Sequence, residues 1–340
     1  MAFTTIDNPE LYFQVKTYTG NGGTLAITLD GSEDMSPNFV WIKERNLTSS
    51  HALTDTVRGN TKKIKTDDSD AEETNTNLIT SFDSDGFTLG DNGNANQSSS
   101  QTYVAWCWVE SATAGFDIVS YTGNSSDGTT TQDISHSLSA VPHWILVKNR
   151  ADATNFAVYH KGNTSSPETE IIYLNVTNAT ADDNAFWGDT VPTSSQFRVG
   201  GDNGVNGNSD AMIAYLWSEK KGFSKFGSYT GTGNNDGAFV FTGFSPAFIM
   251  IKRSDSTGQW GMNDTKRDFN DEYGNDNSVF ADNHQVETSS GSLNVDFLSN
   301  GFKLRSDNNE YNNNGGSYFY MAFANSPFVN SNKIPNNARQ

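Results

Sequence analysis

The stretch that decides the fold is Phe39-Val40-Trp41-Ile42-Lys43, because the chain repeats it. An apolar run closed by lysine returns as WILVK at residues 144–148 and as FIMIK at residues 248–252. A short continuous apolar run is typical of a central strand that is buried on both faces. Three such runs, at intervals of roughly 105 residues, predict three copies of one structural unit.

Other landmarks accompany each run in the same order. Tyr-Thr-Gly precedes it, at residues 18–20, 121–123 and 229–231, and an aromatic strand closes each copy, at residues 103–108, 212–217 and 319–324. A unit of this length can enclose a core of its own. The copies are therefore interpreted as modules rather than as turns of a solenoid.

The residues between the landmarks indicate strands. Val, Ile, Thr, Tyr and Phe cluster in short runs bounded by Gly, Asn, Asp and Ser, without a strand–helix–strand rhythm. We expect an all-β chain of three tandem antiparallel β-sandwich modules, jelly-roll or concanavalin/lectin-like. The expected boundaries are an N-terminal arm at 1–12, modules at 13–112, 113–220 and 221–328, and a tail at 329–340. The joints are very short, which predicts a compact, semi-rigid body of three lobes.

The charge balance excludes several partners. Acidic residues number 40 and basic residues 22, for a net charge of −18. Such a surface repels phosphate backbones and anionic membranes, so we expect no nucleic-acid partner and no membrane insertion. No basic segment followed by an apolar one opens the chain, so no signal peptide is evident and synthesis in the cytoplasm is expected. Cys107, the only cysteine, lies in an apolar strand and is interpreted as a buried, inert thiol.

Catalytic motifs are missing from the sequence. It contains no nucleophile elbow, P-loop or dinucleotide fingerprint, and its five histidines do not have metal-ligand spacing. Asp83 and Asp85 are spaced like a carboxylate pair on one strand face, but the other two copies lack them. A turn before a strand explains all three copies. We expect a protein without enzymatic activity and without a cofactor.

Each copy has a loop rich in Asp, Asn and Gly before its last strand. Oxygen-bearing side chains on a tight backbone suit calcium, which makes these loops candidate metal sites. The candidate ligands are Asp91, Asn92, Asn94, Asp202, Asn206, Asp210 and Asp307. No glutamate closes the loops at EF-hand spacing, so a hairpin turn or longer loop is the favoured alternative to a structural calcium.

Cations recur at the end of the repeated run. They are Lys43, Lys148 and Lys252, each with an arginine nearby at Arg45, Arg150 and Arg253. A basic spot in an acidic protein suits a carboxylate or sulfate. The recurrence favours the other interpretation, in which each cation pairs with the acidic loops of its own module.

Two tryptophans break the repeat. Trp187 and Trp260 lie outside the shared apolar strands and have no equivalents in the other modules. An exposed aromatic ring stacks on the C–H face of a sugar, so these residues are candidates for glycan binding. The alternative is local core beneath a long loop, and the sequence favours neither.

The termini are candidates for assembly contacts. The arm offers Phe3, Ile6 and Tyr12. The tail offers Lys333, Ile334 and Arg339, and unlike the rest of the chain it contains no acidic residue. The tail is interpreted either as a frayed terminus or as a peg that orders on a neighbouring subunit of opposite charge.

Several motifs of the first module have a family likeness. They are YTGNG (18–22), VWIK (40–43), DTVRG (55–59), SFDSDGFTLG (81–90) and YVAWCW (103–108). This set resembles repeat modules in virion structural and tail proteins of marine tailed bacteriophages, and residues 320–328 resemble the way such chains end. Modules two and three keep the order of the motifs, but many residues within the motifs differ.

The resemblance implies a component of a phage particle surface, either a tail or fibre protein or a capsid decoration. The expected partners are other virion proteins, and the expected location is the virion, assembled in the host cytoplasm. A homo-oligomer is compatible with this role. The alternative function is a host-binding adhesin that recognises cell-surface glycans. The resemblance supplies no catalytic residues.

Overall fold

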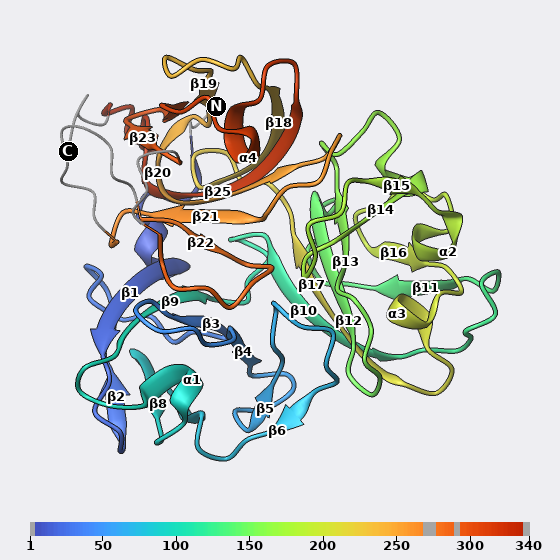
Figure 1. Cartoon of the computed structure of the whole chain (residues 1–340), viewed down its shortest axis with the longest axis horizontal. Coiled ribbons are helices and arrows are strands. Elements are labelled where there is room, and N and C mark those ends of the chain that lie inside the picture. Colours follow the sequence, from blue (N-terminus) through green and yellow to red (C-terminus); the bar gives the residue numbers. More distant parts are fainter. Residues whose placement is uncertain (1–3, 268–276, 289–292, 336–340) are drawn as a thin grey trace.

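The computed structural model describes residues 4–267, 277–288 and 293–335. Three lobes surround a common centre, and nearly all regular structure is antiparallel strand (Figure 1). The predicted all-β antiparallel fold is confirmed. Each lobe has an inner sheet that faces the centre and a smaller outer sheet.

Module 1 follows the short helix η1 (Pro9–Leu11). Its inner sheet has the order β1 (Phe13–Thr19), β9 (Thr102–Trp108), β3 (Phe39–Glu44), β4 (Ala52–Asp55). Its outer sheet has the order β2 (Leu25–Ile27), β8 (Gly86–Leu89), β7 (Ile79–Asp83). A two-stranded ribbon, β5 (Lys62–Lys63) and β6 (Glu73–Thr74), and one helical turn, α1 (Gly93–Asn96), complete the module.

Module 2 repeats this plan and extends it. Its inner sheet has the order β10 (Phe116–Thr122), β17 (Ala211–Trp217), β12 (Trp144–Asn149), β13 (Ala157–His160), β14 (Glu170–Tyr173), β15 (Ala181–Asp182). Its outer sheet pairs β11 (Gln132–Ser135) with β16 (Gln196–Val199). The helical turns are η2 (Pro167–Thr169), α2 (Asn184–Trp187) and α3 (Asn203–Asn206).

Module 3 has the same arrangement. Its inner sheet has the order β18 (Ser224–Thr230), β25 (Ser317–Pro327), β20 (Phe244–Arg253), β21 (Gly261–Asp264), β22 (Val279–Phe280). Its outer sheet has the order β19 (Phe239–Phe241), β24 (Gly301–Leu304), β23 (Val295–Leu298), and its helical turn is α4 (Asn309–Asn312).

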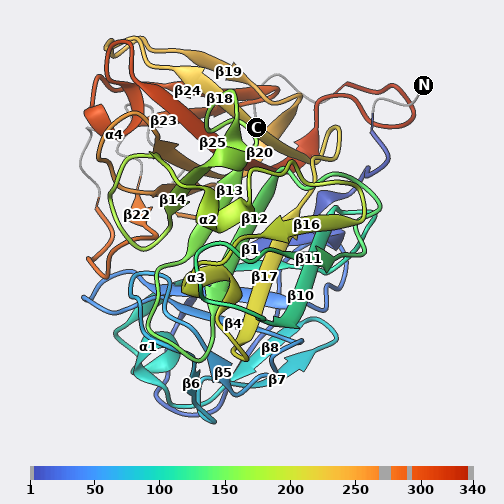
Figure 2. The same ribbon diagram turned by 90° about the vertical axis from the view of Figure 1, so that its right-hand side faces the viewer.

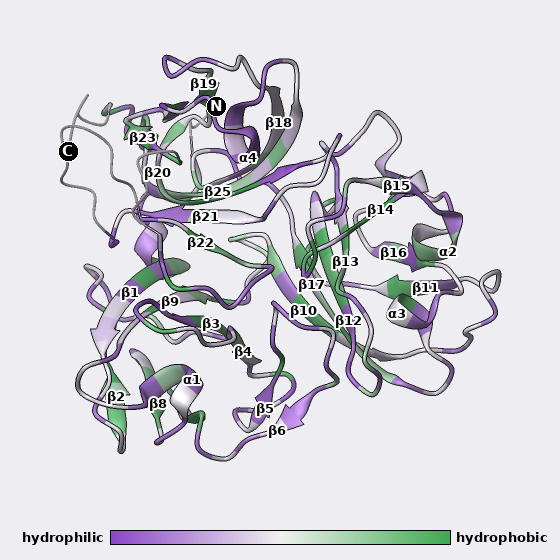
Figure 3. Ribbon diagram, in the orientation of Figure 1, coloured by the Kyte–Doolittle hydropathy of each residue, from purple (hydrophilic) through white to green (hydrophobic). Residues whose placement is uncertain are grey.

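The repeated apolar run is the third strand of each inner sheet, and it is buried on both faces as predicted. In β3, Phe39 and Trp41 join the central cluster, while Val40 and Ile42 pack with Phe87 inside module 1. Successive side chains of a strand point to opposite faces, so a strand with a core on each side needs apolar residues throughout. Figure 3 shows the hydrophobic residues gathered on these strands.

All three modules contribute to the largest hydrophobic cluster. Equivalent cross-strand pairs meet there: Phe39 with Trp108, Trp144 with Trp217, and Phe248 with Phe323. The Trp108 ring lies 6.3 Å from that of Trp217 and 5.5 Å from that of Phe323, so it contacts both other modules. Modules 1 and 2 also have separate interior clusters. The three lobes therefore share one core, which includes the interior of module 3, while modules 1 and 2 also have interiors of their own.

Candidate functional site

The lysine that ends each repeated run lies buried at a seam between two modules. The ammonium groups donate to backbone carbonyls of the neighbouring module: Lys43 to His284 (3.5 Å), Lys148 to Ser69 (3.1 Å) and Lys252 to Thr177 (3.1 Å). Burial lowers the pKa of each lysine to about 8. The carbonyl oxygens offset part of the cost of placing these charges away from water.

Backbone hydrogen bonds mark the same three seams. The N–H of Glu72 donates to the carbonyl of Arg150 at 3.0 Å, that of Thr180 to Ser254 at 2.9 Å, and that of Glu287 to Arg45 at 2.8 Å. Module 1 thus contacts module 2, module 2 contacts module 3, and module 3 contacts module 1, each time with equivalent atoms. The seams form a closed ring with approximate threefold symmetry.

Two seams contain a buried ion pair. Arg58 lies 2.5 Å from Asp55, which also accepts the phenol hydrogen of Tyr215 in module 2 at 2.7 Å. At the seam between modules 3 and 1, Arg267 lies 2.6 Å from Asp264, and the indole of Trp106 donates to Asp264 at 2.9 Å. Tyr215 and Trp106 occupy equivalent positions on β17 and β9, so each supplies the donor that its neighbour's carboxylate needs.

A glutamate completes each of these two seams. Glu72 accepts hydrogen bonds from Arg58 of its own module and from Arg150 of module 2. Glu287 does the same with Arg267 and with Arg45 of module 1.

The prediction that the recurring cations pair within their own module is therefore wrong for Arg45 and Arg150. It holds for Arg253, which pairs with Asp255 at 2.8 Å. The three lysines bind carbonyls rather than acidic side chains. The repeat places Arg45 and Arg150 at module boundaries, where each pairs with a glutamate of the next lobe.

The seam between modules 2 and 3 has histidine at the position where the other two seams have aspartate. His160 lies opposite Trp144, as Asp55 lies opposite Phe39 and Asp264 opposite Phe248. Its Nδ1 accepts the N–H of Gly162 at 2.9 Å, so its Nε2 carries the hydrogen and donates to the carbonyl of Tyr320 in module 3 at 3.0 Å. The ring is fully buried, which lowers its pKa to about 3.

This neutral histidine predicts an acid-sensitive seam. Below a pH of about 6.5 an unfolded chain protonates His160, whereas the folded chain resists until about pH 3. Its contribution to stability is therefore complete above pH 6.5 and is lost as the pH falls through this window. We expect urea midpoints to fall from pH 7 to pH 4.5, and to fall less in His160→Gln, whose amide can keep both hydrogen bonds. Equal slopes in the two proteins would contradict the prediction.

A carboxyl pair lies near the joint of modules 1 and 2. Burial and the neighbouring Asp117 raise the pKa of Glu110 to about 7. Backbone N–H groups of Ile118 and Ser137 donate to Glu110 and Asp117, at 3.4 and 2.5 Å. No sequence pattern predicts this pair, because the two residues fall on either side of a module boundary and belong to no recurring motif.

The Asp/Asn/Gly loops are helical turns rather than hairpins. Asn92, Asp202 and Asn308 cap the N-termini of α1, α3 and α4. A buried asparagine ends each turn, at Asn96, Asn206 and Asn312, and holds the loop that follows Tyr-Thr-Gly. The hairpin interpretation is wrong because a side-chain cap and a buried amide stabilise one turn of helix here.

The candidate calcium ligands do not share one site: some bind other side chains of the protein, and others are exposed. Asn94 bonds to Ser49 and Lys63, and Asp210 accepts from Asn149. Asp91 and Asp307 are exposed. Within residues 4–267, 277–288 and 293–335, no group of three or more His, Cys, Asp or Glu side chains converges in a way that could hold a metal ion. Calcium binding by these loops stays a prediction.

The two unmatched tryptophans are core residues. Trp187 is 1% exposed and Trp260 is 0% exposed. Their indole N–H groups donate to the carbonyls of Glu170 and Tyr173, both at 2.9 Å and both on β14. The prediction that these rings stack on glycans is wrong, because neither ring reaches the surface. The alternative of local core is correct.

The terminal residues divide into buried and exposed. Ile6 belongs to the central cluster, and Tyr12 packs edge-on against Phe223 at 6.1 Å, so the arm is part of the folded body. The prediction that Ile6 contacts another subunit is therefore wrong. Ile334 is 61% exposed, next to the exposed Lys333. Phe3 and Arg339 lie outside the described residues.

Two further predictions concern local chemistry. Asp83 accepts hydrogen bonds from Ser81 and Thr88, and Asp85 accepts the N–H of Met35, so both carboxylates serve the β7–β8 turn, as favoured. Cys107 is fully buried, as expected, and burial raises the pKa of its thiol.

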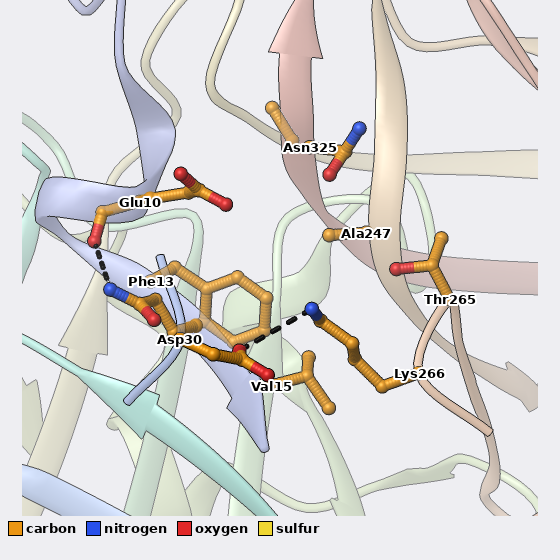
Figure 4. Close-up of a pocket in the computed structure, with 10 residues that line it drawn as sticks. Glu10, Phe13, Val15, Asp30, Ala247, Thr265, Lys266 and Asn325 are labelled. Carbon is orange, nitrogen blue, oxygen red and sulfur yellow. Dashed lines mark hydrogen bonds and ion pairs between the residues drawn. The ribbon is translucent and has the colours of Figure 1, made fainter. Parts of the chain in front are cut away.

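A small cavity lies between modules 1 and 3. Phe13 and Val15 face Ala247 across it, and Lys266 reaches Asp30 at 3.3 Å (Figure 4). Its volume of about 20 Å³ is room for a single water molecule. It is too small to bind a substrate.

Comparison with known proteins gives a family but no function. No curated protein matches the chain. In the part of the chain that the structure describes, no helix has the length and apolar character needed to cross a bilayer. One family model matches residues 8–327, a range that includes all three modules and all three seams. The chain therefore belongs to the family described as Domain of unknown function (DUF7483).

Proposed function

We propose that the chain is a non-enzymatic structural protein on the surface of a bacteriophage virion, where it attaches to other virion proteins and presents polar loops outward. The observation that supports this proposal best is the closed ring of seams. Three buried lysines and two buried ion pairs are used to fix the modules against one another. A rigid body of this kind suits a particle exposed to the medium.

The distribution of charged groups supports the same role. The recurring cations and the Asp83 and Asp85 carboxylates bind neighbouring groups of the chain itself. The remaining acidic surface favours solubility, and salt screens its self-repulsion. An adhesin for glycans would have to use residues other than Trp187 and Trp260, since both are buried.

The tail is the candidate attachment point. Residues 329–335 form a turn in which the N–H of Asn330 donates to the carbonyl of Ile334, and Val329 bridges to Pro335. Asp7 accepts the N–H of Ser331 at 2.7 Å, so the turn lies against the N-terminal arm. The exposed Ile334 side chain is available to a neighbouring protein.

The test is attachment to particles. We expect Ile334→Asp, and deletion of residues 329–340, to reduce the number of copies on purified virions at least tenfold, while the thermal unfolding temperature changes little. Val191→Asp is the matched control, because Val191 is also an exposed apolar residue but belongs to module 2. Deletion of the arm is unsuitable, since it would remove Ile6 from the core. Unchanged copy numbers in both tail variants would refute attachment through the tail, and absence of the unaltered chain from the virions would refute the virion role.

A further inference from the structure

The outer strand of module 3 departs from the repeat at one position pair. Val240 of β19 faces inward opposite Phe302, as Ile134 does opposite Phe197 in module 2. The outward neighbours of Ile134 are the polar residues Asp133 and Ser135. Those of Val240 are Phe239 and Phe241, which are 46% and 56% exposed. Of the described outer strands β2, β11 and β19, β19 alone presents two aromatic side chains on its outer face.

The same strand has an open backbone edge. Within its sheet β19 pairs only with β24. The bonds from the N–H of Leu304 to the carbonyl of Ala238 and from the N–H of Thr242 to the carbonyl of Asn300 show that the even-numbered residues of 238–242 turn their backbone groups toward β24. In an antiparallel ladder the intervening residues point the other way, so the N–H and C=O of Phe239 and Phe241 face outward. No described residue hydrogen-bonds to this edge. The strand lies at the periphery of the molecule in both views (Figures 1 and 2).

The equivalent edge in module 2 is protected. Asp133 on β11 holds Arg198 at 2.8 Å, so a charged pair covers the outer face there. Charged side chains on an edge strand oppose pairing with another chain, and an apolar edge without them favours it. The edge of β19 has no charged residue at these two positions, where the other two modules have polar or small residues.

We infer that β19 is a self-association surface, which pairs antiparallel with β19 of a second copy of this chain about a twofold axis at Val240. Residues 237–243 read Gly-Ala-Phe-Val-Phe-Thr-Gly, which is nearly symmetric about Val240. Antiparallel pairing about that centre places Phe239 opposite Phe241 of the partner subunit, twice. Each pair exchanges two backbone hydrogen bonds, and cross-strand aromatic pairs add to the stability of a sheet.

The local charge balance allows two copies to approach. The chain as a whole carries a net charge of −18, which opposes self-association. Around β19, however, the acids are neutralised within the same copy: Asp236 pairs with Lys303 at 2.6 Å and with Arg305 at 2.9 Å, and Asp296 pairs with Arg305 at 2.6 Å. The face beside the open edge is therefore close to neutral. The strand is short, so the dimer is expected to be weak and to form at high protein concentration.

The test is sedimentation velocity of the full-length chain over a wide concentration range. We expect a reversible monomer–dimer equilibrium, and a dissociation constant at least tenfold higher for the double variant Phe239→Asp with Phe241→Ser. This variant introduces the residues that module 2 has at these positions, so its fold should be preserved. Val191→Asp changes an exposed apolar residue elsewhere and should leave the equilibrium unchanged.

Amide hydrogen exchange gives a second readout. The amides of Phe239 and Phe241 should become protected as concentration rises, while that of Val240 is protected throughout. A chain that stays monomeric at every concentration would overturn the inference, as would a double variant that dimerises as well as the unaltered chain. A third outcome is possible: the unaltered chain stays monomeric, and the double variant no longer attaches to virions. The edge would then pair with a strand of another virion protein, and self-pairing would be refuted.

Discussion

Replacing Trp108 by alanine lowers the free energy of unfolding of the whole chain by about 3–5 kcal/mol, as expected for a large residue removed from a packed core. Trp108 contacts Phe13 of its own module and both Trp217 and Phe323 of the other two. The cavity left by the substitution therefore lies in the shared cluster. All three lobes should lose stability together.

The measurement is chemical denaturation followed by tryptophan fluorescence and by circular dichroism. We expect one coincident transition for the unaltered chain and one, at lower denaturant, for Trp108→Ala. Leu47→Ala is the control, because Leu47 is an exposed apolar residue, and its effect should stay within about 0.5 kcal/mol. A variant in which one lobe unfolds first and two keep their original midpoint would show that the modules are independent.

Asp264→Ala is expected to cost about 3–5 kcal/mol, the range for removal of one partner from a buried ion pair. Among the described residues, the substitution leaves the buried Arg267 guanidinium with Glu287 as its one charged partner, and it removes the acceptor of the Trp106 indole N–H. Both consequences act at the seam between modules 3 and 1. Asp55→Ala should have a similar effect between modules 1 and 2, where Arg58 and Tyr215 are the affected partners.

The matched control is Asp133→Ala, which removes an arginine–carboxylate pair at the surface. Exposed pairs contribute about 0–1 kcal/mol, so this variant should unfold nearly as the unaltered chain does. The measurement is the free energy of unfolding of the three variants, from thermal and urea unfolding at pH 7. Equal losses in Asp264→Ala and Asp133→Ala would mean that the seam pair does not stabilise the ring.

The strands could be predicted from the sequence because their signal is local. A continuous apolar run such as residues 39–43 indicates burial on two faces wherever it occurs, and the repeat supplied two further examples. The partner of each recurring cation could not be predicted. Arg150 meets Glu72 across 78 positions and Arg45 meets Glu287 across 242, and no sequence pattern connects residues at such distances.

The two tryptophans illustrate a different limit. An indole is both apolar and a hydrogen-bond donor, so its presence in an unmatched segment is compatible with the core or with the surface. Trp187 and Trp260 are core residues because backbone carbonyls of β14 accept their N–H groups. The exposed pair on β19 could have been found by comparing the three copies, since Phe239 and Phe241 stand where the other two modules have polar or small residues.

The closed ring of seams is encoded in one chain rather than in three identical ones. Each lobe can therefore change in sequence without the other two. In an assembly of identical subunits, one mutation changes every copy at once. Here a mutation changes a single lobe. Two seams have aspartate while the third has histidine, and one outer strand bears exposed phenylalanines while the other two do not. A nearly symmetric frame can thereby acquire a direction, because lobes that share one plan differ at chosen positions of their seams and outer strands.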